Sequence, residues 1–337
     1  MTICVYGAGS IGCYVGGRLA ATGSQVVFVG RERLAREIAQ HGLTLTDWRG
    51  TELRVPAPRY ETTPDPVVEA DLVLVTVKSA DTGTVAERLA GRLKPGAVVV
   101  SFQNGLRNPE LLRDRLPGAP VLPGVVGFNV VHHGAGRFHC ATGGALEVQQ
   151  HAGLSEAAAA FERAGLPLVQ RADMAGSQAA KLLLNLNNAV NALSGRPLKE
   201  ELSQRAYRRC LALAQREALA AYAAAGITPV KLTPLPPRRM PALLSLPDAV
   251  FTRVASRMLA IDPLARSSMW EDLEAGRATE VDYLNGEIVA LARKHGRQAP
   301  VNQRLVDLVH QAERGGRRDW SGDELLAELT AGIRHRG

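Results

Sequence analysis

A lysine and several asparagines lie close together in an apolar stretch of the sequence. Residues 181–195 read Lys-Leu-Leu-Leu-Asn-Leu-Asn-Asn-Ala-Val-Asn-Ala-Leu-Ser-Gly. In a helix, Lys181, Asn185 and Asn188 would share one face, because side chains three and four residues apart are neighbours. An ammonium on this face can stabilise the negative charge that develops on a carbonyl oxygen and can donate a proton to it. The amides can orient the polar groups of a bound substrate.

The asparagines conflict with the helix that they are predicted to join. Asparagine is a poor helix former, and leaving a buried amide unpaired costs about 1–3 kcal/mol. Such local conflicts tend to occur at functional sites, which makes these residues candidates for substrate chemistry. The alternative is an amide network between helices, with Lys181 extending to solvent, and the pattern alone leaves both interpretations open.

A second candidate site lies at the N-terminus, where an apolar run over residues 3–6 leads into Gly-Ala-Gly-Ser-Ile-Gly and a helical pattern. This spacing is typical of the strand, turn and helix that bind a dinucleotide pyrophosphate. The first glycine allows a sharp turn, the second lets the phosphates approach, and the third lets the helix pack on the sheet. The free N–H groups at the helix start then bind the anion. The predicted contacts are Gly7, Ala8, Gly9, Ser10, Ile11 and Gly12.

The end of the second apolar run indicates which dinucleotide is bound. Residues 25–29 are followed by Gly-Arg-Glu-Arg. An NAD site places an acid near this point, whereas an NADP site places a basic group for the 2′-phosphate. Arg31 stands there, and its planar guanidinium suits a phosphate. We therefore predict NADPH/NADP+ as the cofactor. The alternative takes Glu32 as an NAD-type acid and Arg31 as a solvated charge.

Two further polar residues follow apolar runs of the kind that form buried parallel strands. Lys78 ends the run over residues 71–78, and Asn104 follows the run over residues 97–102. Ligands of open α/β sheets bind beyond the carboxyl ends of the strands, so both residues are predicted to contact the cofactor. A lysine in solvent and an ordinary Asn-Gly turn are the alternatives.

The remaining patterns predict two domains. The 337 residues are 22% charged and 46% hydrophobic, an ordinary globular composition. Strand signals end near residue 152 and helical patterns follow. We predict an α/β N-terminal Rossmann domain with a doubly wound, mostly parallel sheet over residues 1–172, and an all-α C-terminal domain over residues 173–337. The first would bind NADP and the second would hold the substrate and the catalytic residues.

Several local patterns give finer expectations. Residues 43–47 and 52–55 predict a hairpin, and residues 138–140 and 145–148 alternate like paired strands. The Pro-rich residues 227–262 predict a long connection with short helical pieces. After a break near Gly276, a helix is expected to begin again at Thr279, with Glu280 in its first turn.

The composition also argues against several classes of protein. The formal charge of +7 comes from basic residues scattered among acids, without a nucleic-acid-binding motif, so we expect no nucleic-acid partner. The four cysteines show no C-x-x-C spacing, and neither a leader nor a spanning run is present. These features predict a cytoplasmic, soluble protein without a membrane partner. The loop histidines His132, His133 and His139 lack ligand spacing, so no metal site is expected.

Taken together, the motifs resemble the ketopantoate reductase (2-dehydropantoate 2-reductase) family over nearly the whole chain. The matching features are the glycine turn, Arg31, Lys78, Asn104, the Lys-x-x-x-Asn at 181–185, and the Ser-Ser-Met to Asp-Tyr-Leu-Asn-Gly signature of residues 267–286. The resemblance implies NADPH-dependent reduction of 2-dehydropantoate to pantoate, a step of pantothenate and coenzyme A biosynthesis. The alternative is an NADP-dependent reductase of another small-molecule 2-keto acid on the same scaffold. Whether the chain forms a homodimer stays open.

The resemblance also implies roles for single residues. Lys181 corresponds to the family's catalytic lysine, Glu280 to an active-site and cofactor contact, and Val130 to a backbone contact with the cofactor. Asn185 and Ser268 correspond to substrate contacts. The chain departs from the family at Ala189, where a second asparagine is usual, so Asn188 or Asn191 must replace it.

Overall fold

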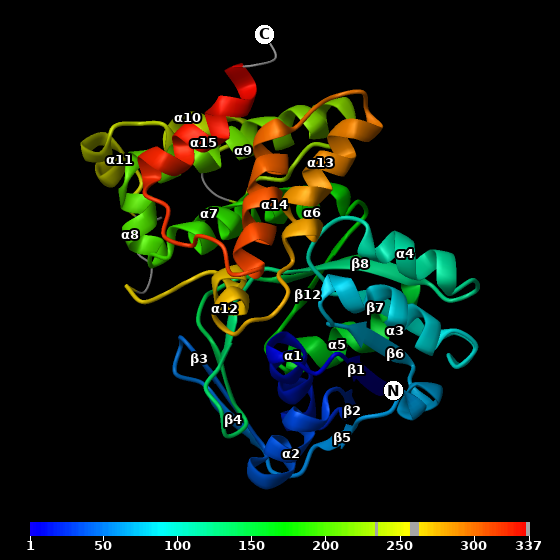
Figure 1. The fold of residues 1–337 in the computed structure, drawn as a ribbon. Coiled ribbons are helices and arrows are strands. Elements are labelled where there is room, and N and C mark those ends of the chain that lie inside the picture. Colours follow the sequence, from blue (N-terminus) through cyan, green and yellow to red (C-terminus); the bar gives the residue numbers. More distant parts are fainter. Residues whose placement is uncertain (233–234, 257–262, 335–337) are drawn as a thin grey trace. The chain divides into compact units, whose positions relative to one another are not determined.

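The computed structural model describes residues 1–232, 235–256 and 263–334. The chain divides into two compact units, Met1–Met174 and Ala175–Gly337, a division two residues beyond the predicted domain boundary. Both units are drawn in Figure 1. In the described part of the chain, no helix combines the length and apolar character needed to cross a membrane.

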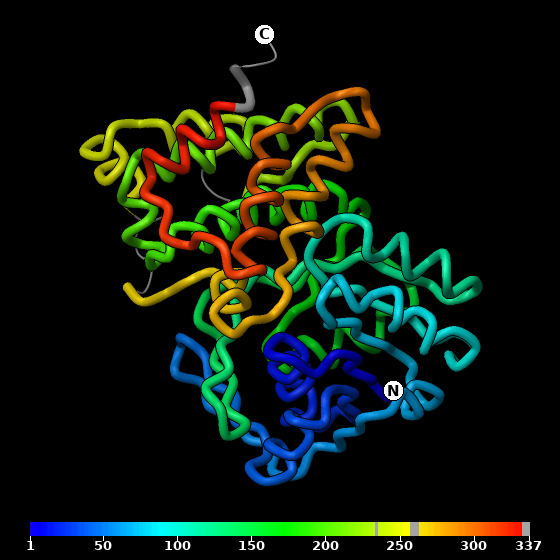
Figure 2. Tube along the Cα trace, viewed as in Figure 1, coloured from blue at the N-terminus to red at the C-terminus, as the bar shows by residue number. Residues whose placement is uncertain are grey.

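The first unit is built on an eight-stranded sheet with the order β12-β11-β8-β7-β6-β1-β2-β5. All neighbouring strands are parallel except β11 and β8. The N-terminal strand, dark blue in Figure 2, therefore lies inside the sheet, between strands that follow it in the sequence. The strands are β1 (Thr2–Tyr6), β2 (Gln25–Val29), β5 (Arg59–Glu61), β6 (Leu72–Val75), β7 (Val98–Ser101), β8 (Val121–Val126), β11 (Leu146–Gln149) and β12 (Leu168–Arg171). The predicted doubly wound, mostly parallel sheet is confirmed.

Helices cover both faces of this sheet, because successive strand residues point to opposite sides. Ile3 and Val5 belong to one apolar core, and Cys4 and Tyr6 belong to the other. The helices are α1 (Ser10–Ala21), α2 (Glu32–His41), α3 (Thr82–Leu89), α4 (Asn108–Arg115) and α5 (Ser155–Arg163), with 3₁₀ turns η1 (Asp65–Glu69), η2 (Ser79–Asp81) and η3 (Ala152–Leu154). Because β1, β2, β6 and β7 are parallel, the loops that follow them emerge at one edge of the sheet. The glycine turn, Arg31, Lys78 and Asn104 lie in these loops.

A second sheet in this unit has the order β4-β3-β10-β9. Its strands are β3 (Leu43–Asp47), β4 (Glu52–Val55), β9 (Val130–His132) and β10 (Arg137–Cys140). The predicted hairpin of β3 and β4 is confirmed. The predicted pairing of residues 138–140 with 145–148 is wrong, because β10 pairs with β3 and β9, whereas β11 pairs with β8 and β12. Gly144 passes so close to Gly127 that a Cβ would lie 2.2 Å from its carbonyl oxygen, so the glycines carry the chain between two sheets.

The second unit contains only helices in its described part, which confirms the all-α prediction. The long helix α9 packs against α10, α13 and α15 (Figure 1). The helices are α6 (Ala175–Asn185), α7 (Asn187–Ser194), α8 (Leu198–Ser203), α9 (Arg205–Ala224), α10 (Met240–Leu244), α11 (Asp248–Val254), α12 (Ser268–Glu274), α13 (Asn285–Lys294), α14 (Pro300–Glu313) and α15 (Gly322–Arg334), with η4 (Pro237–Arg239) and η5 (Val281–Tyr283). The Pro-rich segment thus holds short helical pieces, while residues 233–234 and 257–262 lie outside the described residues.

The prediction of one continuous helix over the lysine and asparagines is wrong. Helix α6 ends at Asn185 and α7 begins at Asn187. Near this break, the side-chain amide of Gln215 donates a hydrogen bond of 3.0 Å to the carbonyl of Leu183. A side chain that enters the hydrogen-bond ladder is a known cause of a helix break, and the asparagines do little to resist it.

The expected helix start at Thr279 is also wrong in detail. Glu280 precedes the three-residue turn η5, and the α-helix begins only at Asn285. The hydroxyl of Thr279 accepts a hydrogen bond from the N–H of Val281 at 3.3 Å. This local bond satisfies the backbone donor at the start of η5, whereas the N-cap position of η5 is Glu280 and no side chain caps it. Thr279 therefore begins no α-helix.

Candidate functional site

The glycine turn leaves β1 in a backbone conformation that favours glycine. Gly7 has a φ of +101°, and a Cβ there would lie 2.5 Å from the nitrogen of Val77. Its N–H donates to the carbonyl of Val29 at 2.8 Å, and its carbonyl accepts from Thr76 Oγ1 at 2.8 Å. At Gly12, a Cβ would lie 2.6 Å from Thr76 Oγ1. The turn is therefore held tightly against the ends of β2 and β6.

The other side of the turn is open. A Cβ at Gly9 would meet no heavy atom nearer than the Gly7 carbonyl oxygen, at 3.9 Å. The first intrahelical bond of α1 runs from the Cys13 N–H to the Gly9 carbonyl at 2.8 Å, and the first turn contains no acidic residue. Preceding N–H groups thus lack a helical partner and favour an anion. These are the N–H groups of Ser10, Ile11 and Gly12.

Arg31 and Glu32 differ in what surrounds them. The Arg31 side chain is 80% exposed and lies 3.4 Å from a carboxylate oxygen of Asp81, an exposed pair of small energetic value. The Glu32 carboxylate instead accepts a 2.9 Å hydrogen bond from Arg36 along α2. Both side chains are therefore exposed, and each forms one surface ion pair.

Lys78 and Asn104 follow the adjacent strands β6 and β7, which are in register from Leu72 opposite Val98 to Val75 opposite Ser101. Both residues are half-buried. The carbonyl of Asn104 accepts a hydrogen bond from the side chain of Asn108 at 2.6 Å. The structure thus places both residues in neighbouring loops at the edge that carries the glycine turn.

Val130 is half-buried at the start of β9, where it pairs with Cys140. The strand is tied to α2 because Glu37 contacts His132 Nε2 at 2.6 Å and accepts from the Gly136 N–H at 2.8 Å. Burial alone would raise the pKa of Glu37, but the hydrogen bonds from Gly136 and His132 outweigh it and hold that pKa below its usual range. A charged Glu37 therefore fixes the backbone near Val130.

In the second unit, Lys181 lies half-buried on α6. Within the described residues its side chain forms no hydrogen bond and no ion pair. Burial lowers the pKa of the Lys181 ammonium, because the charged form loses hydration. A lysine with a lowered pKa is a better proton donor near neutral pH, so this environment fits the predicted chemistry.

The structure distinguishes the two asparagines that could replace the family's second one. Asn191 is fully buried, and its amide donates to Glu201 at 2.8 Å and to the Arg196 carbonyl at 2.9 Å. Its oxygen accepts from the Ser267 N–H at 2.9 Å. Asn188 is half-buried, and its side chain has no hydrogen bond within residues 1–232, 235–256 and 263–334. The amide-network interpretation therefore describes Asn191, and Asn188 is the candidate for a ligand contact.

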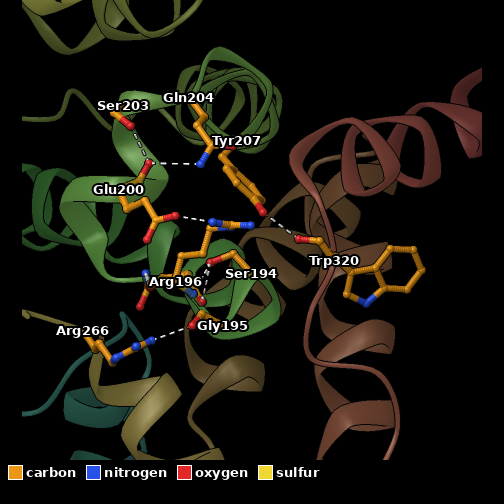
Figure 3. Close-up of polar contacts among 10 residues, drawn as sticks. Ser194, Gly195, Arg196, Glu200, Ser203, Gln204, Tyr207, Arg266 and Trp320 are labelled. Atoms are coloured by element: carbon orange, nitrogen blue, oxygen red, sulfur yellow. Dashed lines mark hydrogen bonds and ion pairs between the residues drawn. The ribbon is translucent and has the colours of Figure 1, made fainter.

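Ser268 begins α12, which packs against α7. The preceding residues hold it there: Ser267 Oγ donates to the carbonyl of Asn188 at 3.3 Å, and Arg266 donates to the carbonyl of Gly195 at 2.7 Å. Figure 3 shows Arg266 reaching Gly195 beside the Arg196–Glu200 ion pair. The exposed Ser268 is thereby fixed near the start of α7.

Glu280 is half-buried, and α14 fixes the backbone on both sides of it. Glu313 accepts from the Thr279 N–H at 2.8 Å, and His310 contacts Glu313 at 2.7 Å and Asp282 at 3.0 Å. Burial lowers the pKa of His310, but the hydrogen bonds to Glu313 and Asp282 outweigh it and raise that pKa overall. No pattern in the sequence indicated this support.

Comparison with known proteins agrees with this architecture. The family model described as "Ketopantoate reductase PanE/ApbA" matches residues 3–153, and its C-terminal counterpart matches residues 173–313. The chain belongs to the ketopantoate reductase family. It is 33% identical to the 2-dehydropantoate 2-reductase of Halobacterium salinarum over 94% of this chain and 100% of that protein. Membership makes the chain an oxidoreductase that uses a nicotinamide cofactor.

Solved structures add two comparisons. A PanE/ApbA family ketopantoate reductase from Ralstonia eutropha JMP134 superimposes with a TM-score of 0.80 at 29% identity, covering 94% of this chain and 99% of that one. A D-mandelate dehydrogenase solved with NADH and anilino(oxo)acetate gives a TM-score of 0.78 at 21% identity, over 94% and 99% of the two chains. The second likeness shows the fold alone.

Proposed function

We propose that this chain catalyses the NADPH-dependent reduction of 2-dehydropantoate to pantoate. The observation that carries the proposal is Lys181, a half-buried ammonium without an ion-pair partner in the described residues and with a pKa lowered by burial. The glycine turn after β1, which would bind the dinucleotide, lies on the same chain. The 2-dehydropantoate 2-reductase of Halobacterium salinarum, similar over its whole length, supports the choice of substrate.

The first unit supplies the residues that would hold the cofactor. The N–H groups of the glycine turn would bind the pyrophosphate, and Arg31 would bind the 2′-phosphate. Lys78, Asn104 and Val130 would contact the remaining ribose and nicotinamide groups, and Glu280 of the second unit would add a further cofactor contact. Bound NADPH supplies the hydride for the substrate's keto carbon.

The second unit supplies the acid. The Lys181 ammonium would donate a hydrogen bond to the keto oxygen and transfer its proton as negative charge develops there. Its low pKa makes this transfer easier than from a fully hydrated lysine. Asn185 and Asn188 would donate hydrogen bonds to the substrate carboxylate, and Ser268 would pair with the 4-hydroxyl. Glu280, as a carboxylate, would accept a hydrogen bond from a hydroxyl in the same site.

A second candidate is reduction of a different 2-keto acid on the same scaffold. Ala189 favours it, because this residue replaces the asparagine that the family usually has there. An amide at Asn188 instead of at residue 189 would change which groups of the substrate receive a hydrogen bond. A cytoplasmic location also stays a prediction.

The test is a comparison of substrates with purified protein. We expect NADPH oxidation with ketopantoate to exceed that with 2-keto-3,3-dimethylbutyrate, which lacks the 4-hydroxyl, by orders of magnitude in kcat/KM. The analogue would leave the proposed partners of the hydroxyl, Ser268 and Glu280, without it, and a site that hydrogen-bonds a substrate hydroxyl rejects an analogue that lacks this group. Comparable kcat/KM values would favour the second candidate, and the same assay with NADH measures the cofactor preference.

A further inference from the structure

Five polar side chains lie buried behind the loops that carry Lys78 and Asn104. Burying a polar group is costly unless it is hydrogen-bonded, and apolar groups of the same shape are often as stable. A fully bonded polar cluster beside a candidate site therefore suits the positioning of that site. The buried side chains are those of Ser79, Thr82, Ser101, Gln103 and Asn108.

Gln103, just beyond β7, begins the cluster. Its side-chain nitrogen donates to the Val77 carbonyl at 3.2 Å and to Thr82 Oγ1 at 2.7 Å, and its oxygen accepts from Ser101 Oγ at 3.0 Å. The two acceptors of the nitrogen fix the orientation of the amide. Because that nitrogen can only donate, the Thr82 hydroxyl keeps its own proton for another acceptor.

That acceptor is Asn108, at the start of α4. Thr82 Oγ1 donates to Asn108 Oδ1 at 2.9 Å. Asn108 Nδ2 in turn donates to the Asn104 carbonyl at 2.6 Å and to Ser79 Oγ at 2.9 Å, so both of its protons are used. Each donor in the network thus has defined acceptors, and a fully bonded network of this kind specifies a single arrangement of its side chains.

The ends of this network flank both candidate contacts. It reaches the residues on either side of Lys78, namely Val77 and Ser79, and the backbone of Asn104 itself. Strand pairing between β6 and β7 ends at Val75 and Ser101. The side chains thus continue the connection between the two loops beyond the point where the sheet stops.

We infer that Thr82 is a positioning residue for the dinucleotide. Its hydroxyl orients the amides of Gln103 and Asn108. These amides, together with the hydrogen bond of 3.3 Å from Ser79 Oγ to the Asn104 carbonyl, hold the loop with Lys78 against the loop with Asn104 in the geometry that the cofactor needs. The inference rests on the proposed function, since it takes Lys78 and Asn104 as cofactor contacts. Thr82 itself is fully buried in the first turn of α3 and acts through these neighbours.

The experiment compares Thr82→Val with Thr82→Ser. Valine keeps the volume and removes the hydroxyl, whereas serine keeps the hydroxyl and removes a methyl group. Each variant is titrated with NADPH and with NADH, following the fluorescence of the reduced nicotinamide, and its thermal midpoint is recorded. We expect Thr82→Val to raise the Kd of the preferred cofactor about tenfold, and Thr82→Ser to keep it within about twofold despite any lower midpoint.

Equal affinities in both variants, or affinity losses that follow the thermal midpoints, would overturn the inference. Asn108→Asp provides a second route if Thr82→Val does not fold, because aspartate keeps the acceptor for Thr82 and loses both donors. It is expected to weaken cofactor binding to a similar extent. The substrate comparison with the wild-type protein judges the proposed function separately. A wild-type chain that binds neither nucleotide would overturn both.

Discussion

The two candidate sites differ in the chemical groups that they offer to a ligand. In the first unit, the predicted pyrophosphate contacts are backbone N–H groups, and glycines create the space in front of them. In the second unit, the predicted contacts are side chains on α6, α7 and α12, held by buried partners such as Asn191. A backbone site tolerates many side chains but is blocked by a single Cβ. A side-chain site depends on which atoms its residues carry.

This difference predicts how substitutions divide between binding and turnover. Changes at the glycine turn and at Arg31 should act on the Kd of the nucleotide, because these groups are predicted to contact its phosphates, which do not react. Changes at Lys181 should act on kcat, because that ammonium is proposed to stabilise charge that exists mainly in the transition state. Each substitution below tests one side of this division.

The largest effect is expected at Lys181. Lys181→Ala should lower kcat by about 10²–10⁴, the range for a lost general acid, while leaving the Kd of NADPH nearly unchanged. Steady-state kinetics and nucleotide titration measure the two quantities. Lys199→Ala, an exposed lysine on the nearby helix α8, is the control and should behave as wild type. Near wild-type turnover of Lys181→Ala would make this lysine structural.

The glycine turn provides the second test. Gly9→Ala should raise the Kd of NADPH by about tenfold or more, because the new Cβ occupies the space in front of the N–H groups while meeting no nearby protein atom. Its thermal midpoint should therefore stay near that of the wild type. Nucleotide titration and thermal unfolding together check the prediction.

Gly12→Ala is the matched variant for the same helix. Its Cβ would lie 2.8 Å from the Gly7 carbonyl oxygen and 2.9 Å from a methyl of Val5, and overpacking of this kind costs about 1–3 kcal/mol. It should lower the thermal midpoint as well as affinity. If Gly9→Ala also lost stability, the space at Gly9 would not be the open approach that we describe.

Arg31 gives the third test. Arg31→Ala should weaken NADPH binding about tenfold or more, the scale of a lost charge-assisted hydrogen bond of about 1.5–3 kcal/mol, with little change for NADH. Arg33→Ala removes an equally exposed charge two residues away and serves as the control. Equal losses for both nucleotides would mean that Arg31 does not read the 2′-phosphate.

The sequence predicted the first unit well because its signals are local. The glycine turn, the strand ends and the hairpin of β3 and β4 each follow from residues adjacent in the chain. The pairing of β10 failed because its partners, β3 and β9, are chosen by packing between distant segments. Alternation of apolar and polar residues indicates that a segment forms a strand, but it does not indicate which other strand that segment pairs with.

The second unit shows a similar limit within the candidate site. The spacing of Lys181 and Asn185 was readable, but the break at Leu186 was not, because it accompanies a hydrogen bond from Gln215 on α9. The different surroundings of Asn188 and Asn191 also depend on remote residues, namely Glu201 and Ser267. Thr82 and its partners escaped notice because buried hydroxyls and amides leave no periodic pattern in a sequence.

The smallest expected effect is on the pH dependence of the thermal midpoint, and it comes from Glu201, the buried partner of Asn191. Burial raises the pKa of Glu201 to about 8, although hydrogen bonds from Asn191 and Asn187 oppose this. A folded state that holds the proton more tightly than the unfolded state is most stable below the unfolded pKa, and it loses that advantage as pH rises through the folded pKa. The wild-type thermal midpoint should therefore contain a decrease between about pH 5 and pH 8 that originates at Glu201.

Glu201→Gln should remove this part of the pH dependence, because a glutamine stays neutral while its oxygen still accepts from Asn191. We expect its thermal midpoint at pH 8 to exceed that of the wild type by a few degrees, since each kcal/mol shifts the midpoint by about 2–4 °C in a unit of this size. Glu200→Gln changes an exposed neighbouring carboxylate and should leave the wild-type profile intact. Parallel profiles for wild type and Glu201→Gln from pH 5 to pH 8 would show that Glu201 is already ionised when folded. In that case the side-chain site would rest on a buried charge, and Asn191 would be held more strongly than a neutral acid could hold it.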